Sequence, residues 1–369
     1  MSTPSAPLLE ARRISKHFKV GGALGRKVLH AVDDASFVIG DREIVALVGE
    51  SGSGKSTIAR LLARVYTPTS GEIEYRGQPL RDIRSRRESL AYRSDVPMVF
   101  QDPFSALTPT YPVSHGIMRG LKLHRPELTG AQRVAEAVRV FEIVGLHPAA
   151  DVLQRFPHEL SGGQRQRVGF AQALSYRPKL ILADEPVSML DVSIRIGLLN
   201  VMADLRETAG VSMLYITHDL ASARYVADRL MVMYAGRIVE SGPMEEVLSN
   251  PSHPYTELLV SAVPDPRAPL AITADAARGE PPRVIDPEPG CRFRWRCPVA
   301  IGDCATEMPE LEPVGPGHNA ACHVATRSSA AMRPDGESEI AARVHIRLTG
   351  APPAFPAQQM AKTVEPNIT

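Results

Sequence analysis

The chain has 369 residues, with 42 Lys and Arg against 41 Asp and Glu, which leaves a formal net charge of +1. This length suits one large α/β domain with an extension. The balanced charge gives no overall electrostatic attraction to nucleic acid or to an anionic membrane surface. No run approaches the roughly 18 apolar residues of a membrane span, and the first residues lack the basic start and apolar core of a secretory signal. We therefore expect a protein that stays in the cytoplasm.

The first part of the chain predicts a series of strands that leads into a glycine-rich segment. The strands are expected at 8–14, 28–32, 35–39 and 44–48, with a flexible loop at 21–25. A helix-compatible run follows the glycine-rich segment at 58–64. This strand–loop–helix order is the context that a phosphate-binding loop needs.

The glycine-rich segment fits the phosphate-binding pattern G-x-x-x-x-G-K-[ST]. Its glycines let the backbone bring N–H groups close to phosphate oxygens, and the helix that follows directs its positive end at the anion. Lys55 should reach the β- and γ-phosphates, and Ser56 should bind Mg2+ through its hydroxyl. A chance glycine-rich turn is the less favoured alternative. The predicted nucleotide-binding residues are Gly49, Glu50, Ser51, Gly52, Ser53, Gly54, Lys55, Ser56 and Thr57.

The middle of the chain is mainly helical in pattern, from about 102 to 175. Thr129 is expected to cap a helix at 131–144. The arginine-rich segment 81–87 is interpreted as a solvated surface. The remaining predicted elements are helices at 161–175 and 192–209, buried strands at 180–183 and 213–216, and a hairpin at 230–240.

Two carboxylates stand at the end of the apolar strand 180–183. In open α/β sheets, ligands bind at this end of the strands. Asp184 is therefore expected to hold Mg2+, and Glu185 to polarise a water molecule for attack on the γ-phosphate. A solvated acidic turn is the alternative interpretation of the pair.

A second anion-binding helix start is predicted at Leu160-Ser161-Gly162-Gly163-Gln164. Ser161 is a typical N-cap, and the two glycines leave backbone N–H groups accessible. A single nucleotide cannot easily use both helix starts at its γ-phosphate.

The order of these motifs resembles the nucleotide-binding subunit of ATP-binding cassette (ABC) transporters. The motifs are GESGSGKST (49–57), Gln101 after a strand, LSGGQRQR (160–167), LILADEP (180–186), MLD (189–191) and His218 after a strand. The resemblance covers about residues 8–262. It implies an α/β P-loop NTPase cassette with a RecA-like core, an antiparallel β subdomain and a helical subdomain at about 102–175.

The resemblance also implies a head-to-tail dimer with ATP between the P-loop of one chain and the LSGGQ segment of the other. Ser161, Gly162, Gly163 and Gln164 would then contact the partner's nucleotide. Phe18 would stack on adenine, although core packing is an alternative. Gln101 would contact Mg2+ and the attacking water, and it would couple to the membrane subunit. Asp191 would lie across the dimer interface, and His218 would hold the γ-phosphate. As alternatives, Gln101 could be a surface residue, and His218 could be a neighbour of a helix cap.

The C-terminal part resembles the extension of ATPases from oligopeptide and dipeptide importers. The resemblance is carried by His253-Pro254-Tyr255-Thr256 and by the segment from Cys291 to His323. We expect an ABC domain at 1–263, a Pro-rich linker at 264–289, a Cys-containing module at 290–325 and a disordered tail at 326–369. Thr108-Pro109-Thr110 and Met189 depart from the usual family residues, Asn-Pro-Arg and Ala.

The four cysteines, Cys291, Cys297, Cys304 and Cys322, leave three interpretations open: a [4Fe-4S] cluster, a zinc ion or no metal. Structural zinc usually shows a C-x2–4-C pair, which this spacing lacks. Arg292, Arg294 and Arg296 would add positive charge beside an anionic cluster. Both points favour iron–sulfur, as the resemblance does. His318 and His323 would be spare ligands for zinc.

The resemblance implies an ATPase subunit, with ATP and Mg2+ as cofactors, that powers peptide import from the cytoplasmic side of the cell membrane. The implied partners are a second, non-identical ATPase chain, two transmembrane permease subunits and, indirectly, an extracytoplasmic solute-binding protein, without nucleic acid. Nickel or another small solute is an alternative cargo. A soluble ABC ATPase acting on nucleic acid is a further alternative, but it should show a heptad insertion, a second cassette or a basic face. A non-catalytic regulatory cassette is disfavoured by the intact Lys55, Asp184, Glu185 and His218.

Overall fold

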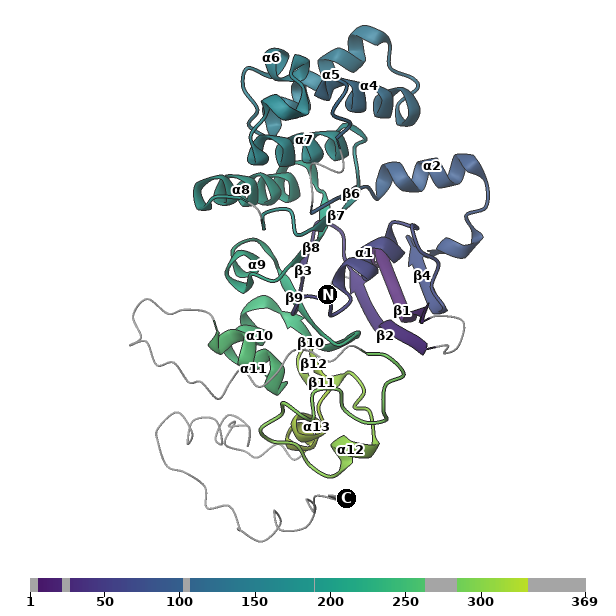
Figure 1. Cartoon of the computed structure of the whole chain (residues 1–369), viewed down its shortest axis with the longest axis vertical. Helices are drawn as coiled ribbons and strands as arrows, with labels where there is room; N and C mark the ends of the chain where they lie inside the picture. The colour runs from purple at the N-terminus through teal and green to yellow at the C-terminus, as the bar shows by residue number, and fades with distance from the viewer. Residues whose placement is uncertain (1–5, 22–26, 102–106, 189, 263–283, 331–369) are drawn as a thin grey trace, which may run out of the picture.

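The computed structural model describes residues 6–21, 27–101, 107–188, 190–262 and 284–330. Two sheets organise these residues, with helices on both sides of the larger one (Figure 1). Several expectations lie outside the described residues: most of the loop at 21–25, Met189, the linker up to residue 283 and the tail from residue 331.

The smaller sheet is antiparallel, with strand order β2-β1-β4-β5. Its strands are β1 (Leu9–Val20), β2 (Lys27–Ile39), β4 (Ser70–Tyr75) and β5 (Gln78–Pro79). The prediction of separate strands at 28–32 and 35–39 is wrong, because both belong to β2. Asp34, which lies between the two predicted strands, adopts a φ of 56° at an irregularity in the β1–β2 pairing, and its carboxylate pairs with Arg13. A bulge at Asp33 and Asp34 therefore interrupts the regular pairing without ending the strand.

The larger sheet has the order β11-β12-β10-β9-β3-β8-β7-β6. Strands β6 (Met98–Val99), β7 (Leu180–Asp184), β8 (Ser212–Thr217), β3 (Ile44–Val48) and β9 (Arg229–Tyr234) form its parallel part. Every residue of β3, β7 and β8 is buried, as expected for strands covered on both faces. Their carboxyl ends meet at one edge, which brings residues distant in sequence together.

Helices cover both faces of this sheet. Helix α1 (Lys55–Leu62) packs against strands of both sheets, and α2 (Arg86–Asp95) follows a short 3-10 turn, Leu80–Asp82. Helices α4 (Val113–His124), α5 (Gly130–Ile143), α6 (Ala149–Gln154) and α7 (Gly162–Ser175) pack together at one end of the molecule, with a second 3-10 turn at Pro157–Glu159 (Figure 1). The predicted Thr129 cap is confirmed, because its side chain accepts from Gln132 N. Helix α8 (Val192–Ala209) packs against α7 and α9 (Leu220–Val226), and α9 also packs against β3 and β8.

The C-terminal residues extend the larger sheet. Strand β10 (Arg237–Pro243) pairs with β12 (His318–Ala320), which pairs with β11 (Glu312–Gly315). Around them lie α10 (Met244–Ser249), α11 (Pro254–Ser261), α12 (Asp303–Thr306) and α13 (His323–Ala330). The expectation of disorder from residue 326 is therefore wrong for 326–330, which continue α13.

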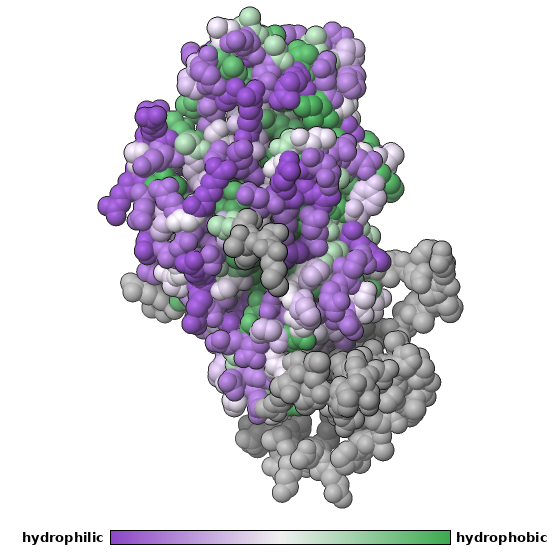
Figure 2. Space-filling view, turned by 180° about the vertical axis from the view of Figure 1, so that it is seen from behind, coloured by the Kyte–Doolittle hydropathy of each residue, from purple (hydrophilic) through white to green (hydrophobic). Residues whose placement is uncertain are grey.

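The surface is mostly hydrophilic on the face drawn in Figure 2, where apolar areas are small and separate. The helices of the described ranges include none with the length and apolar character needed to cross a bilayer.

A buried carboxylate, Glu240 on β10, joins the C-terminal strands to the preceding helices. It is 0% exposed. It accepts from Ser252 N at 2.7 Å and from His253 N at 2.9 Å, and its Oε1 lies 2.7 Å from His318 Nε2. These partners satisfy a charge that would otherwise be costly to bury.

We predict that Glu240→Ala lowers the free energy of unfolding by about 3 kcal/mol, because it leaves two buried N–H groups and an imidazole without their acceptor. Urea denaturation followed by circular dichroism measures this. The matched control is Glu245→Ala on α10, whose pair with Arg224 is exposed, and it should cost no more than about 0.5 kcal/mol. Equal midpoints for the two variants would contradict the prediction.

Candidate functional site

The P-loop connects β3 to α1 and lies against backbone from two other strands. Gly49 has φ 155° and Gly54 has φ 110°. A Cβ on Gly49 would lie 2.1 Å from Met233 O, and one on Gly54 would lie 2.2 Å from Ala31 O. Glycine is therefore required at both positions by space, and at Gly54 also by backbone conformation. At Gly52 nothing lies within 4 Å of the corresponding point, so this part of the loop is open.

Lys55 begins α1 and turns its ammonium group back over the loop. Its Nζ donates to Gly49 O and to Glu50 O, each at 2.8 Å. Burial lowers the pKa of Lys55, while Glu185, Asp184 and Glu50 oppose the shift. The chain thus holds a cation against the P-loop, and its contact with the β- and γ-phosphates stays a prediction.

Two of the three residues predicted to bind Mg2+, Ser56 and Asp184, contact each other, whereas the third, Gln101, is hydrogen-bonded to Glu185. Ser56 Oγ donates to Asp184 Oδ1 at 3.0 Å, and Asp184 is 4% exposed. Burial raises the pKa of Asp184, and the hydrogen bond from Ser56 acts against that shift. Two adjacent oxygen donors, one of them a carboxylate, fit the hard-ligand preference of Mg2+.

Three predicted catalytic residues meet at the Glu185 carboxylate. Gln101 Nε2 donates to Glu185 Oε2 at 2.9 Å, and His218 Nδ1 lies 3.3 Å from the same oxygen. The three residues follow β6, β7 and β8, whose carboxyl ends are neighbours in the sheet. Glu185 itself adopts a φ of 46°, which is uncommon for a residue with a side chain and is often found at functional sites. The structure thus brings this predicted set together around one carboxylate.

Phe18 lies near the end of β1 and is half-buried. Its ring packs edge-on against Tyr66 with centroids 5.3 Å apart, and Lys16 Nζ lies 5.2 Å from its centroid. These contacts fix the ring. Stacking on adenine stays a prediction.

The predicted second anion site, the LSGGQ segment, begins α7, in the helical part of the molecule and away from α1 (Figure 1). Ser161 Oγ accepts from Gln164 N at 3.2 Å, and Gln164 Oε1 accepts from Ser161 N at 3.0 Å, so the two side chains form a capping box. A Cβ on Gly163 would lie 2.6 Å from Ile194 Cγ2, whereas Gly162 faces open space. Gly163 thus permits close packing on α8, and Gly162 leaves the helix start accessible.

The cassette part and the C-terminal part of the sequence each match a known family. The ABC transporter family matches residues 32–188, and the oligopeptide/dipeptide transporter C-terminal region matches residues 239–304. A putative peptide import ATP-binding protein of Brucella ovis is 43% identical over 316 residues, which cover 86% of this chain and 97% of that protein.

The chain belongs to the ABC transporter ATP-binding proteins.

Other relatives and a solved structure agree with this family. The putative oligopeptide transport ATP-binding protein YkfD of Bacillus subtilis is 40% identical, covering 86% of this chain and 95% of its own length. The oligopeptide transport ATP-binding protein AppF of Bacillus subtilis is also 40% identical, covering 86% and 97%. A dimeric structure of the ATP-binding cassette MJ0796 in a post-hydrolysis state, bound to ADP and Pi, aligns with a TM-score of 0.58 at 26% identity, covering 64% of this chain and 98% of that one. The predicted P-loop NTPase cassette is confirmed, and the chain is an ATPase of the ABC transporter type.

Sequence reasoning missed how the ABC ATPase supports its P-loop from the C-terminal part. Glu50 N donates to Tyr255 Oη at 2.9 Å, and the Glu50 carboxylate pairs with Arg296. Both partners stand in segments that were assigned to the family extension, but nothing in their spacing pointed to the P-loop. Only the three-dimensional structure brings them together.

The predicted role of the three arginines as positive charge beside a cluster is wrong. Each pairs with a carboxylate instead: Arg292 with Asp33, Arg294 with Glu288 and Arg296 with Glu50. Their charges are therefore balanced by the protein.

The four thiols are also not packed closely enough to surround a single metal ion. Among the described residues, the sole group with three ligand atoms within 4.8 Å of one another is His17, His30 and Asp33, so no three cysteines form such a group. Burial raises the pKa of Cys291 and Cys322, and it raises that of Cys297 to about 12. The spare histidines are engaged elsewhere, His318 with Glu240 and His323 with Glu307 O. The arrangement argues against zinc and adds no support to iron–sulfur.

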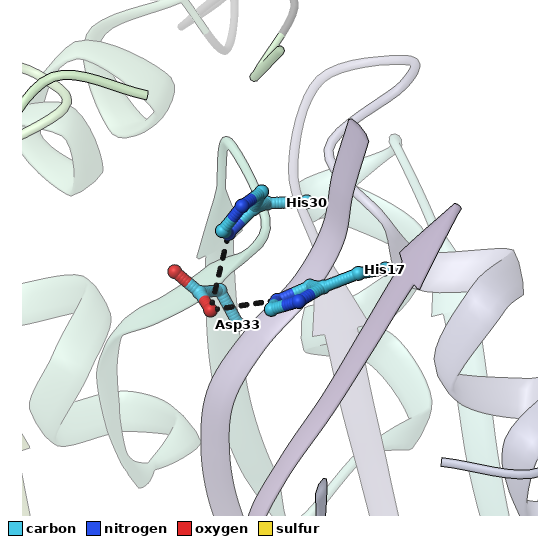
Figure 3. A group of neighbouring side chains, drawn as sticks. All are labelled: His17, His30 and Asp33. Atoms are coloured by element: carbon cyan, nitrogen blue, oxygen red, sulfur yellow. Dashed lines mark hydrogen bonds and ion pairs between the residues drawn. The ribbon is translucent and has the colours of Figure 1, made fainter. Parts of the chain in front are cut away.

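The group of His17, His30 and Asp33 is shown in Figure 3, where the side chains point toward one another from β1 and β2. Asp33 Oδ1 lies 3.1 Å from His17 Nε2 and 3.5 Å from His30 Nδ1, and the two rings lie with centroids 3.8 Å apart, tilted by 32° to each other. Burial acts most strongly on the pKa of Asp33 and would raise it, but Arg292, His17, His30 and Arg237 together outweigh burial, and the pKa lies below its usual value. Because a guanidinium already balances this carboxylate, we assign the group to the contact between β2 and the C-terminal segment.

Proposed function

We propose that this ABC ATPase powers import of peptides, acting at the cytoplasmic side of the cell membrane. The match of residues 239–304 to the oligopeptide/dipeptide transporter C-terminal region carries the proposal. The names of the relatives, which mention peptide or oligopeptide transport, support it and do not favour nickel or a nucleic acid. In this function, ATP binding closes a dimer of ATPase chains, and hydrolysis reopens it.

In the proposed mechanism, Glu185 accepts a proton from the attacking water through its carboxylate, which Gln101 Nε2 orients. Lys55 holds the β- and γ-phosphates, and His218, which lies beside the Glu185 carboxylate, contacts the γ-phosphate. Bound Mg2+, held by Ser56 and Asp184, would supply charge neutralisation on the transferred group. Catalysis is mainly positioning and charge stabilisation.

The proposed dimer places the α7 start of one chain over the P-loop of the other. The exposed Asp191 and the open side of Gly162 are available for such a contact. Val192 and Ile196 on α8 are 69% and 46% exposed, which supplies apolar surface beside Asp191. We propose that the second chain is a different ATPase of the same family.

We also propose that the two permease subunits bind beside the helical part of the ATPase, and that a solute-binding protein outside the cell delivers the cargo. Gln101 begins the segment expected to contact the permease, but residues 102–106 lie outside the described ranges. A cavity of about 460 Å³ opens beside α2, between the segment that follows α1 and the end of α4. Its lining is strongly basic and includes Arg64, Arg84, Arg86, Arg93 and the exposed Leu123. This lining suits an acidic, amphipathic helix of a permease.

We predict that reversing charge in this cavity with Arg84→Glu and Arg93→Glu weakens permease binding, because both arginines line the cavity. Co-purification of the permeases with the tagged double variant should fall by about tenfold, while ATP binding is retained. The matched control is Arg87→Glu, which reverses a charge on α2 outside the lining. Unchanged co-purification of the double variant would rule out this docking site.

The hydrolysis step is tested by Glu185→Gln, which keeps the side-chain shape but removes the proton acceptor. In the assembled complex, turnover should fall by about a hundredfold or more, and ATP should remain bound in a closed dimer. ATPase activity and size-exclusion chromatography with ATP measure both effects. Unchanged turnover would remove Glu185 from the proposed role.

For the cysteines, we retain the [4Fe-4S] cluster as a proposal with its own test. The resemblance of the C-terminal part supports it, and a four-iron cluster separates its ligand sulfurs more widely than a single ion does. Anaerobic purification should then give a brown protein with broad visible absorption and bound iron. A colourless, iron-free preparation would end the proposal.

A further inference from the structure

One residue of the P-loop is held by the C-terminal part of the chain through both its backbone and its side chain. Glu50 N donates to Tyr255 Oη at 2.9 Å. The Glu50 carboxylate accepts from Arg296 Nη1 at 3.0 Å and from Nη2 at 2.9 Å, each on a different oxygen. Glu50 O in turn accepts from Lys55 Nζ. Glu50 therefore links Lys55, the phosphate-binding cation, to two C-terminal residues.

The Arg296–Glu50 ion pair holds the two side chains in a defined orientation. It is bidentate, and the side chains are 11% and 25% exposed. The guanidinium also lies 5.7 Å from the ring centroid of Tyr234 and 5.8 Å from that of Phe293. A charge-assisted pair with two parallel hydrogen bonds and restricted solvent access is directional and stronger than a typical surface pair.

The segment that carries Arg296 is itself fixed to the strands around the P-loop. Phe293 is 2% exposed and packs edge-on against Tyr234, and it also contacts the rings of Tyr255 and His253. Arg292 donates to Ala235 O and to the Asp33 carboxylate. The segment 291–297 thus spans β2, the turn after β9 and the P-loop, and cannot shift without moving these contacts.

The charge of Glu50 explains why this support matters for the nucleotide. A carboxylate on the P-loop lies close to the expected position of a triphosphate and would repel it. Arg296 neutralises that carboxylate and holds it by two hydrogen bonds. Removing Arg296 would leave a partly buried negative charge beside the anion site.

We propose that Arg296 is a positioning residue for ATP binding, and that the Cys291–Cys297 segment thereby forms an outer wall of the nucleotide site. The segment acts through Glu50 and touches no nucleotide itself. By thermodynamic reciprocity, nucleotide binding must also stabilise this segment.

The test is equilibrium ATP binding by the full-length chain, measured together with the melting temperature without nucleotide. Arg296→Met should raise the Kd for ATP about tenfold. Adding Glu50→Gln to that variant should recover most of the affinity, because it removes the unpaired carboxylate. The matched control is Arg294→Met in the same segment, whose partners are Glu288 and Pro289 O; its Kd should stay within about twofold.

Three results with the variants would overturn the proposal. One is an Arg296→Met variant with a lowered melting temperature but an unchanged Kd, which would make the pair purely structural. The second is an equal loss of affinity in Arg294→Met, and the third is no recovery of affinity in the double variant. Hydrogen exchange of the unmodified chain gives a readout that is independent of folding in the variants: a non-hydrolysable ATP analogue should slow exchange at 291–297, and unchanged exchange would contradict the proposal.

Discussion

The close approach of the P-loop backbone to two neighbouring strands is the constraint on which the nucleotide site depends. Gly49 lies against Met233 O and Gly54 against Ala31 O, with no room for a side chain at either contact. The loop is thus held between β2 and β9, and Gly236 N donates to Ser53 O from the turn after β9. Arg292 donates to Asp33 of β2 and to Ala235 O in the turn after β9, and the Arg296 guanidinium lies over the ring of Tyr234 in β9. The loop that binds phosphate is therefore supported by the strands of the cassette and by the C-terminal segment together.

The residues proposed to be catalytic are positioned by a second feature, the common edge of the parallel strands. Gln101, Glu185 and His218 come from three strands that are neighbours in the sheet, and their side chains converge on one carboxylate. This convergence follows from topology, since Glu185 and His218 directly follow the buried strands β7 and β8, and Gln101 lies two residues after the end of β6. Small changes in strand register would separate the three groups by several ångströms.

Much of the nucleotide site could be predicted because its chemistry is local in sequence. The P-loop glycines, Lys55 and Ser56 lie within nine residues, and Asp184 and Glu185 end a recognisable buried strand. The long-range contacts could not be predicted, because nothing in the spacing of Glu50 and Arg296 indicates that they pair. The arginines between the cysteines were misinterpreted for the same reason: a positive charge in a sequence does not identify its partner. The single strand β2 was also missed, because a bulge can accommodate Asp33 and Asp34 where a pattern suggests a break.

The pairing of β12 with β10 makes the C-terminal strands a continuation of the sheet that carries the nucleotide site. If the chain were cut after α11, β10 would become an unpaired edge, and the buried Glu240 would lose His318. Exposed edges of this kind recruit other strands and promote aggregation. The conventional end of an ATP-binding cassette is therefore not the end of the stable folded unit in this protein. A chain shortened at that point should not be used in place of the complete chain.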